Sequence, residues 1–361
     1  MVVDAAYSLG EKILRGLVHW NLVLSATVVL VSGTTVVAQQ PAVQSAGNEP
    51  LTVMTWNLEW FYDENPGDNF SRLAREKSAP DRGKWDWRRD AIANRIAGVR
   101  PTVVAVQEIE NRRVLYYLTR ALSRNHQLSY NEYALEGRDF FTEQDVGYLV
   151  RRPADVAALI QRGYVQRLRS TNQFYDVSKH LFAEIEFQDG SDVHRVLILN
   201  IHLRAKPEGE AFRRRQARLM QHWVAEVVSA GRDVIVLGDF NSEETADQTL
   251  ADSDLGIAAG LQTPSPNDDL IDLNLRLPRS SRQTHMLPGR QYDRILCSRS
   301  LLEDDPSKPD LVFSKIENLR EMCIQGEADD PEQHWNDYWS LAEDQRDLSD
   351  HYPVMATFEI R

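Results

Sequence analysis

Short apolar runs that end in polar residues recur along this chain. The clearest is Val234–Leu237, in which three of the four apolar residues are β-branched and which the segment Gly238–Asn241 follows. Such a run predicts a strand buried on both faces. Because side chains alternate along an extended backbone, Asp239 and Asn241 would lie on the same side just beyond the strand. An Asx-rich turn that merely closes a strand would have the same sequence.

Further runs with the same character predict the remaining strands. They are 51–56, 102–106, 146–150, 181–187, 193–201, 291–296 and 354–360. The turn signal Gln188-Asp189-Gly190-Ser191 predicts that the runs on either side of it are adjacent strands. Helical spacing of apolar residues predicts helices over 88–99, 111–125 with Asn111 as the N-cap, and 208–230. Strands interleaved with a few helices favour a layered α/β or α+β domain.

The first 38 residues have the pattern of a targeting segment. Lys12 and Arg15 precede an apolar run over 21–31, and small residues lead to Ala38. This order is typical of a secretory signal peptide cleaved after Ala38, which predicts a secreted or periplasmic protein with no stable membrane insertion after cleavage. An uncleaved segment would instead anchor the protein in a membrane, although the run is short for a spanning helix.

Composition beyond this segment favours one folded domain. Residues 39–50 are polar and predict a linker, and residues 51–361 then form a single domain with a charged, irregular insertion at about 299–346. The 361-residue chain is 42% hydrophobic, which is enough for a sizeable core. Its formal net charge of −13 argues against packaging of nucleic acid by bulk electrostatics. The charge does not exclude an enzyme in which a bound cation meets phosphate.

The chain has two cysteines, Cys297 and Cys323. Export would place them in an oxidising compartment, where they could form one disulfide. Two buried free thiols would fit the sequence equally well, because spacing alone does not decide between the two arrangements.

Ionisable and amide side chains stand at or beside the ends of the apolar runs. They are Asn57, Glu59, Glu108, Asp145, His202, Asp239, Asn241, Asp293, Asp350 and His351. Each alone has an ordinary explanation, such as a solvated loop, a core histidine or an ion pair. Together they would gather several carboxylates and two imidazoles in one region, although a buried carboxylate costs on the order of several kcal/mol unless it is paired or metal-bound.

This set of side chains is suited to one kind of chemistry. Carboxylate and amide oxygens without a cysteine cluster favour a hard cation, Mg²⁺ or Mn²⁺, over structural zinc. A histidine with a carboxylate behind it makes a general base with a fixed tautomer. The combination predicts metal-assisted hydrolysis of a phosphoric ester.

Six motifs, in order along the chain, resemble those of the endonuclease/exonuclease/phosphatase superfamily. They are Thr55-Trp56-Asn57-Leu58-Glu59, Val106-Gln107-Glu108-Ile109, Asn200-Ile201-His202-Leu203, Gly238-Asp239-Phe240-Asn241, Tyr292-Asp293-Arg294-Ile295 and Ser349-Asp350-His351. The resemblance spans about residues 51–361. It implies a four-layered α/β/β/α sandwich of two packed, mostly antiparallel sheets.

The resemblance also implies a site for one Mg²⁺ ion, with Mn²⁺ as an alternative. In that site Glu108 is the main metal ligand, and Asn57 and Asp350 lie close by. Glu59, two residues after the asparagine, is a further ligand or supports one.

The remaining motifs imply the catalytic groups. His351, oriented by Asp293, would activate water, while Asp239 and Asn241 would position that water and the phosphate. His202 matches the second histidine of the deoxyribonuclease and sphingomyelinase branches. Asp145, ahead of the strand at 146–150, is the candidate carboxylate partner of His202.

The function expected from these residues is an exported, Mg²⁺-dependent phosphodiesterase, most simply an endonuclease with nucleic acid as its substrate. A sphingomyelinase-type phospholipase C or a phosphatase is the alternative, although the sequence shows no clear exposed apolar hairpin of the kind that a lipid-cleaving member needs. An inactive binding module on the same scaffold ranks last, because the expected catalytic residues are all present. Nothing in the sequence implies a protein partner.

Overall fold

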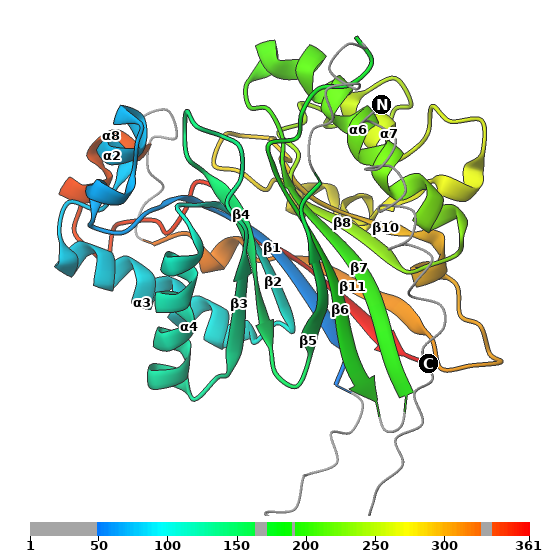
Figure 1. The fold of residues 1–361 in the computed structure, drawn as a ribbon, viewed down its shortest axis with the longest axis horizontal. Coiled ribbons are helices and arrows are strands. Elements are labelled where there is room, and N and C mark those ends of the chain that lie inside the picture. Colours follow the sequence, from blue (N-terminus) through cyan, green and yellow to red (C-terminus); the bar gives the residue numbers. More distant parts are fainter. Residues whose placement is uncertain (1–48, 163–171, 190–191, 326–333) are drawn as a thin grey trace, which may run out of the picture. The chain divides into compact units, whose positions relative to one another are not determined.

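Strands dominate the fold, and those of the described residues form two six-stranded sheets (Figure 1). The computed structural model describes residues 49–162, 172–189, 192–325 and 334–361, which belong to the unit Ser45–Arg361. The predicted signal peptide and most of the predicted linker lie outside the described residues. Within the described ranges, no helix is long and apolar enough to cross a membrane.

The first sheet has the strand order β11-β12-β1-β2-β4-β3 and the second has the order β5-β6-β7-β8-β10-β9. The strands are β1 (Leu51–Phe61), β2 (Val103–Ile109), β3 (Tyr130–Ala134), β4 (Asp145–Arg151), β5 (Asp155–Ile160), β6 (Lys179–Asp189), β7 (Asp192–His202), β8 (Val234–Asp239), β9 (Leu270–Asp272), β10 (Asp293–Ser298), β11 (Leu311–Asn318) and β12 (Val354–Ile360). In the described part of each sheet one pair is parallel, β1 with β2 and β7 with β8, and the other pairs are antiparallel. The prediction of mostly antiparallel sheets is therefore confirmed.

Helices cover the outer faces of the two sheets. The α-helices are α2 (Arg72–Lys77), α3 (Arg82–Val99), α4 (Arg112–His126), α6 (Glu210–Ser229), α7 (Asp254–Ala258) and α8 (His334–Asp337). Short 3-10 helices occupy Pro66–Asp68, Pro207–Gly209, Pro266–Asp268, Leu273–Arg276, Arg279–Ser281, Arg299–Leu302, Arg320–Met322 and Tyr338–Ser340. The three predicted helices correspond to α3, α4 and α6. The side chain of Asn111 caps α4 by accepting a hydrogen bond from the Arg113 N–H.

Alternation along the strands produces three layers of core between four layers of structure. Met54 and Val104 point outward, into a core with apolar residues of α3 and α4. Val53 points the other way, into the core between the sheets. In the second sheet Val236 packs outward, in a core with residues of α6 and α7. Since a strand buried on both faces must be apolar at every position, this arrangement explains the continuous apolar runs and confirms the α/β/β/α sandwich.

The structure corrects the sequence prediction at the sheet edges. The strands that the sequence analysis did not identify, β3, β5, β9 and β11, are the edge strands of the two sheets. The irregular character predicted for residues 299–346 is wrong in part, because β11 lies among them and pairs with β12, whereas their being an insertion stays a prediction. The helix predicted over 88–99 begins earlier, at Arg82, and α2 precedes it.

Both cysteines are buried free thiols. Cys297 lies in the core between the sheets, whereas Cys323 lies in the core beneath α3 and α4. The two side chains therefore belong to separate layers, and the alternative of one disulfide is wrong for this structure.

Candidate active site

The predicted site residues converge because central strands of both sheets end in the same region. In the second sheet Asp239 pairs in register with His202 on one side and with Asp293 on the other. In the first sheet Asn57 pairs with Gln107 at the end of the regular pairing of β1 with β2, and Glu108 follows Gln107 on β2. Asp350 and His351 directly precede β12, which pairs with β1.

Unusual backbone conformations direct several of these side chains into the site. Glu108 has a φ of 57°, and the pairing of β2 shifts register at that residue. Glu59 and Asn241 also have positive φ values, 42° and 49°. Such conformations cost on the order of 1–3 kcal/mol each and cluster at functional sites. Gly238 has a φ of 133°, and a Cβ there would lie 2.0 Å from the Ile201 carbonyl oxygen, so only glycine fits.

A histidine–carboxylate pair joins the two sheets. His351 Nδ1 donates to Asp293 Oδ2 at 2.8 Å, and both side chains are buried. Since a carboxylate can only accept, Nδ1 carries the proton and Nε2 is the free acceptor of the neutral ring. That Nε2 atom lies 3.8 Å from both Asp239 Oδ2 and Asp350 Oδ1. Burial alone would lower the pKa of His351, but Asp293, Asp350 and Asp239 outweigh it and raise that pKa well above its ordinary value.

Asn57 links the two sheets a second time. Its Nδ2 donates to Glu108 Oε1 at 3.2 Å and to Asp239 Oδ2 at 3.0 Å, while its Oδ1 accepts the Glu59 N–H at 2.9 Å. Asn57 thus holds two carboxylates at a fixed separation. Its expected role as a metal ligand stays a prediction, because its side chain is already bonded at both ends to protein groups.

Glu108 is buried beside a second carboxylate, an environment that disfavours its charged form unless a cation is bound nearby. Its Oε2 accepts the Trp60 N–H at 3.2 Å. Burial, and next the nearby carboxylate of Asp350, raise the pKa of Glu108 to about 7. Asp350 Oδ1 is buried and accepts no hydrogen bond from the described residues. Two facing carboxylates with an unused oxygen are a donor set that suits a hard divalent cation.

The structure also groups these residues as possible ligands of a metal ion. Among the described residues, three sets of three side chains have ligand atoms within 4.8 Å of one another. Two belong to this site, namely Glu108, His202 and Asp239, and His285, Asp350 and His351. The third set, Asp63, Asp68 and Glu110, includes the residue that directly follows β2. Carboxylates that include Glu108 and Asp350, with one buried Asp350 oxygen that has no hydrogen bond from the described residues, therefore fit a divalent cation.

His202 lies in the site without the partner expected for it. Its Nε2 is 3.5 Å from Asp239 Oδ2 and 3.7 Å from Glu108 Oε1. Burial, Lys179 and His351 lower its pKa well below the ordinary value. No hydrogen bond or ion pair within the described residues joins it to Asp145, and its buried Nδ1 has no partner there. Asp145 instead accepts the Gly137 N–H at 2.7 Å, so its predicted pairing with His202 is wrong. Asp145 does begin a strand of the first sheet, as predicted, but its side chain turns to the loop that precedes this strand.

Asn241 and Glu59 support the site from its periphery. Asn241 donates its backbone N–H to Asp239 Oδ1 at 2.8 Å and its side-chain amide to the Leu203 carbonyl at 3.2 Å. Glu59 Oε2 accepts the Asp350 N–H at 3.1 Å, and its Oε1 lies 3.0 Å from His334 Nδ1. Glu59 therefore holds Asp350, as a residue that supports a ligand would.

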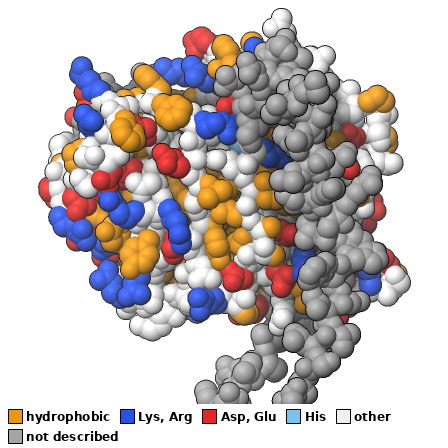
Figure 2. Space-filling model, in the orientation of Figure 1, with side chains coloured by type: hydrophobic (Ala, Val, Ile, Leu, Met, Phe, Trp, Pro, Cys, Tyr) orange, Lys and Arg blue, Asp and Glu red, His pale blue; other side chains and the backbone are white. Residues whose placement is uncertain are grey.

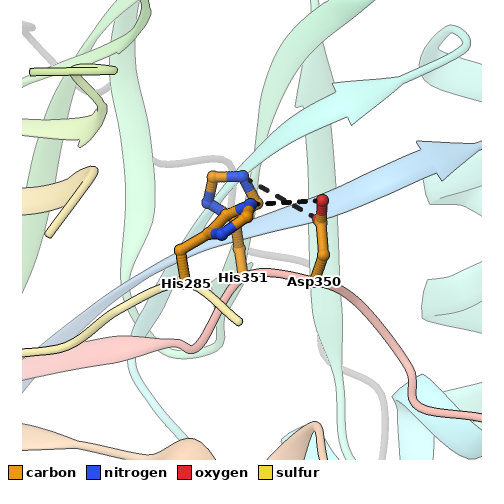
Figure 3. Close-up of side chains that lie close together, drawn as sticks. All are labelled: His285, Asp350 and His351. Carbon is orange, nitrogen blue, oxygen red and sulfur yellow. Dashed lines mark ion pairs between the residues drawn. The ribbon is translucent and has the colours of Figure 1, made fainter. Parts of the chain in front are cut away.

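Two histidines of the site were missed by the sequence analysis. His334 contacts Glu59, and His285 Nε2 lies 3.3 Å from Asp350 Oδ2 (Figure 3). Neither follows an apolar run: His285 lies in an irregular segment, and His334 begins the short helix α8. The only sequence signal was their residue type.

Comparison with known proteins places this geometry in a family. A sequence model of the Endonuclease/Exonuclease/phosphatase family matches residues 54–351. No curated protein sequence matches the chain.

Solved structures resemble the chain over most of its length. Humanized D. rerio TDP2 has a TM-score of 0.51 and 17% identity, with 86% of this chain and 98% of that chain covered. The human Nocturnin catalytic domain with bound sulfate has a TM-score of 0.52 and 16% identity, with 86% of this chain and 95% of that chain covered. An endonuclease/exonuclease/phosphatase family protein from Bacteroides thetaiotaomicron has a TM-score of 0.52 and 16% identity, with 87% of this chain and 99% of that chain covered.

At these identities the likeness to solved structures shows the fold alone. The sequence match, by contrast, covers most of the chain and includes nearly all of the residues that converge in the site. The chain therefore belongs to the endonuclease/exonuclease/phosphatase family of metal-dependent nucleases and phosphoesterases and is a hydrolase of phosphoric esters.

Proposed function

We propose that this enzyme is a Mg²⁺-dependent nuclease that hydrolyses phosphodiester bonds in nucleic acid with a water molecule activated by His351. The observation that carries the proposal is the His351–Asp293 pair, whose free Nε2 faces Asp239 and Asp350 at 3.8 Å. A general base requires that arrangement: a fixed tautomer, a carboxylate behind the ring and space for water in front of it.

The chain's own side chains account for the proton and for the phosphate. His351 Nε2 takes the proton of the attacking water, and Asp293 stabilises the imidazolium that results. Asp239 accepts a hydrogen bond from the same water, while His202 faces the phosphate or the leaving oxygen. Glu108 and Asp350 would hold the divalent cation, which would supply positive charge against the phosphate.

Nucleic acid is the proposed substrate for two reasons. A solved structure of D. rerio TDP2, similar to this chain at a TM-score of 0.50 and 16% identity, is a complex with a single-strand DNA product. The formal charge of −13 is compatible with a phosphate substrate when the metal ion supplies the positive charge at the site. At this identity the likeness shows the fold alone, and the assay described next tests the substrate.

A panel of substrates tests the proposal. Plasmid DNA, single-stranded DNA, RNA, sphingomyelin vesicles and bis(p-nitrophenyl) phosphate are each incubated with Mg²⁺, with Mn²⁺ and with chelator. We expect cleavage of nucleic acid with metal and none with chelator, and loss of cleavage in His351→Ala. Metal-independent cleavage, or unchanged turnover in His351→Ala, would contradict the proposed chemistry.

One observation favours the phospholipase C alternative. The three most exposed large hydrophobic side chains of the described residues are Phe70, Phe140 and Phe141, at 82%, 80% and 72%. The sequence analysis found no clear exposed apolar hairpin, yet Phe140 and Phe141 lie in the connection between the paired strands β3 and β4. The Phe70 N–H donates to Glu143 at 2.9 Å, so the two segments adjoin. Figure 2 shows hydrophobic side chains among charged ones on the face that carries α2 and β4.

The charge next to these phenylalanines points in the same direction. Phe70 and Phe140 line a cavity of about 480 Å³. Its ionisable lining residues are Asp68, Glu110, Glu136, Asp139, Glu143, Asp145, Arg112 and Arg113. An acidic cavity with aromatic side chains at its edge suits a cationic head group such as choline better than a polyanion.

A double variant separates the two functions. In Phe140→Ser/Phe141→Ser, a lipid-cleaving enzyme would lose at least about tenfold of its rate on sphingomyelin vesicles and retain its rate on bis(p-nitrophenyl) phosphate. A nuclease that does not use this surface would retain its rate on plasmid DNA. Wild-type protein inactive on vesicles eliminates the alternative.

Export is also a proposal. The segment before residue 39 has the order of a signal peptide. We expect N-terminal sequencing of protein from the extracellular or periplasmic fraction to begin at Gln39. Recovery of the intact chain in the membrane fraction would favour an anchor instead.

A further inference from the structure

His285 connects to the site in a way that none of its motifs suggested. The residue is buried, with 7% of its surface exposed, in an irregular segment that runs beside the residues before β12. An isolated antiparallel bridge pairs His285 with His351. The Met286 N–H donates to the Asp350 carbonyl at 2.8 Å, and the Tyr352 N–H donates to the Thr284 carbonyl at 2.8 Å.

The hydrogen bonds of the ring fix which nitrogen faces Asp350. The Leu287 N–H donates to His285 Nδ1 at 2.9 Å, so Nδ1 must be the acceptor. In a neutral imidazole the other nitrogen then carries the proton. That Nε2–H points to Asp350 Oδ2 at 3.3 Å, as Figure 3 shows.

Asp350 is thereby held at every polar group except one. Its N–H is bonded to Glu59, its carbonyl accepts from Met286, and its Oδ2 faces His285. Oδ1 is the atom left, buried and without a hydrogen bond from the described residues. A carboxylate oriented in this way presents a single oxygen in a fixed direction.

The ring also limits the freedom of the general base. The His285 and His351 rings meet edge to face, with centroids 4.6 Å apart and planes at 89°. Tyr292 packs against His285 from another side, with centroids 5.1 Å apart. His285 therefore contacts both the Asp350 carboxylate and the ring of the base, which lie 3.8 Å from each other.

We propose that His285 is a positioning residue that directs Asp350 Oδ1 toward the divalent cation. The inference rests on the proposed role of Asp350 as a metal ligand. Groups that orient a metal ligand from behind typically affect metal affinity or activity by about 10–100-fold when they are removed.

Two conservative variants separate this role from a merely structural one. Glutamine places an N–H near the position of Nε2 and so keeps the donor to Asp350, but it loses the acceptor for Leu287. Asparagine places an oxygen near the position of Nδ1 and so keeps the Leu287 bond, but it loses the donor to Asp350. If His285 positions Asp350, the asparagine variant should lose metal affinity and the glutamine variant should keep it. If His285 only stabilises its own loop, the reverse is expected.

The probe is Mn²⁺ alone, titrated into wild-type protein and into His285→Gln, His285→Asn and His285→Ala by electron paramagnetic resonance of the free ion. The control is His126→Gln, a half-buried histidine at the end of α4, away from the site, that bonds to Asn94. We expect about tenfold weaker Mn²⁺ binding in the asparagine and alanine variants, and binding within about threefold of wild type in the glutamine variant and the control. Thermal unfolding with chelator shows that each variant is folded.

A second readout uses bis(p-nitrophenyl) phosphate at increasing Mg²⁺. For His285→Asn we expect a higher half-saturating Mg²⁺ concentration with kcat largely recovered at saturation. Wild-type affinity in the asparagine variant together with weak binding in the glutamine variant would overturn the proposal and leave His285 a loop residue. Wild-type affinity in all three variants would overturn it as well.

Glu108→Gln distinguishes this inference from the proposed function. If that variant loses Mn²⁺ affinity while His285→Asn does not, the metal site stands and only the role of His285 is wrong. If wild-type Mn²⁺ binding is insensitive to Glu108→Gln, the proposed metal site itself is wrong, and the role of His285 falls with it.

Discussion

Glu108 and Glu110 are two residues apart, near the end of β2 and just after it, and they have similar pKa values and hydrogen-bond partners. Burial is the largest cause that raises the pKa of each to about 7, and a neighbouring aspartate is the second. Each accepts one backbone N–H and one asparagine amide: Trp60 and Asn57 for Glu108, and Asp63 and Asn69 for Glu110.

The difference between them lies in the source of positive charge. The aspartates beside Glu110, Asp63 and Asp68, both form ion pairs with Arg113, at 2.8 Å in the case of Asp63. Glu108 faces Asp350 and Asp239, and within the described residues its only ion-pair contact is His202 at 3.7 Å. One cluster therefore contains its own cation, while the other is arranged for a cation from outside. Burial and a raised pKa alone do not separate a catalytic carboxylate from a structural one.

The largest expected effect is that of Glu108→Gln. Removing the charge should lower kcat/KM by at least about 10³-fold and abolish Mn²⁺ binding, because the site then lacks its main ligand. The matched variant Glu110→Gln should stay within about threefold of wild type in both measurements. Similar losses of activity in the two folded variants would break the comparison.

Asp293→Asn should act on the base and leave the metal site intact. We expect kcat to fall by about 10²–10⁴-fold, since a neutral amide in place of the carboxylate no longer fixes the tautomer or stabilises the imidazolium. Asp293 is one of the groups that raise the pKa of His351. Because the base acts in its neutral form, the acid limb of the pH–rate profile should move to lower pH in the variant.

Mn²⁺ titration and the pH profile of kcat check this expectation. Weakened Mn²⁺ binding in Asp293→Asn, or an acid limb that moves to higher pH, would show that Asp293 does not act through His351 alone.

Glu110→Ala should affect stability rather than chemistry. It removes the acceptor of the Asp63 N–H and one of the two acceptors of the Asn69 amide, whose other acceptor is Ser78 Oγ, and Arg113 stays beside two carboxylates. Unsatisfied buried donors cost about 1–3 kcal/mol each, so we expect a loss of about 2–4 kcal/mol in the free energy of unfolding. Urea denaturation measures the loss, and kcat/KM of the folded protein should change by less than about threefold.

The smallest expected effect is a pH dependence at Glu110. Its pKa rises from 4.5 to about 7 on folding, so the folded state binds the proton more tightly than the unfolded state. The stability that this proton contributes is complete below pH 4.5 and is lost as the pH rises through 7.

Comparison of wild type with Glu110→Gln isolates this contribution. From pH 5 to pH 8, in chelator, the free energy of unfolding of the glutamine variant should rise relative to wild type by about 1–3 kcal/mol. A difference that is constant with pH would show that the carboxyl group does not titrate in this range.

The strands separate into those that the sequence reveals and those that it does not. Central strands such as β2 and β8 are covered on both faces, so their sequences are continuously apolar and easily identified. The edge strand β5 has no buried residue, and β9 has three residues in all. Pairing partners, not local preference, make such segments into strands.

The site separates in the same way. Asn57, Glu108, His202, Asp239 and Asp293 were identified because they follow or begin central strands. Asp145 met the same criterion, yet its carboxylate turns to Gly137. His285 met no criterion, although it contacts both Asp350 and His351. Position along a strand places a residue near the site but does not choose its hydrogen-bond partner.

The amino-acid sequence by itself determined the central strands, the family and the residues at the strand ends, because alternation and apolar runs are local properties. Only the tertiary structure decided that Asp145 turns to Gly137 and away from His202, that His285 and His334 join the site, and that Arg113 pairs with the aspartates beside Glu110. These depend on strand register and on the packing of one sheet against the other, which bring together residues as distant in the chain as Asn57 and Asp239.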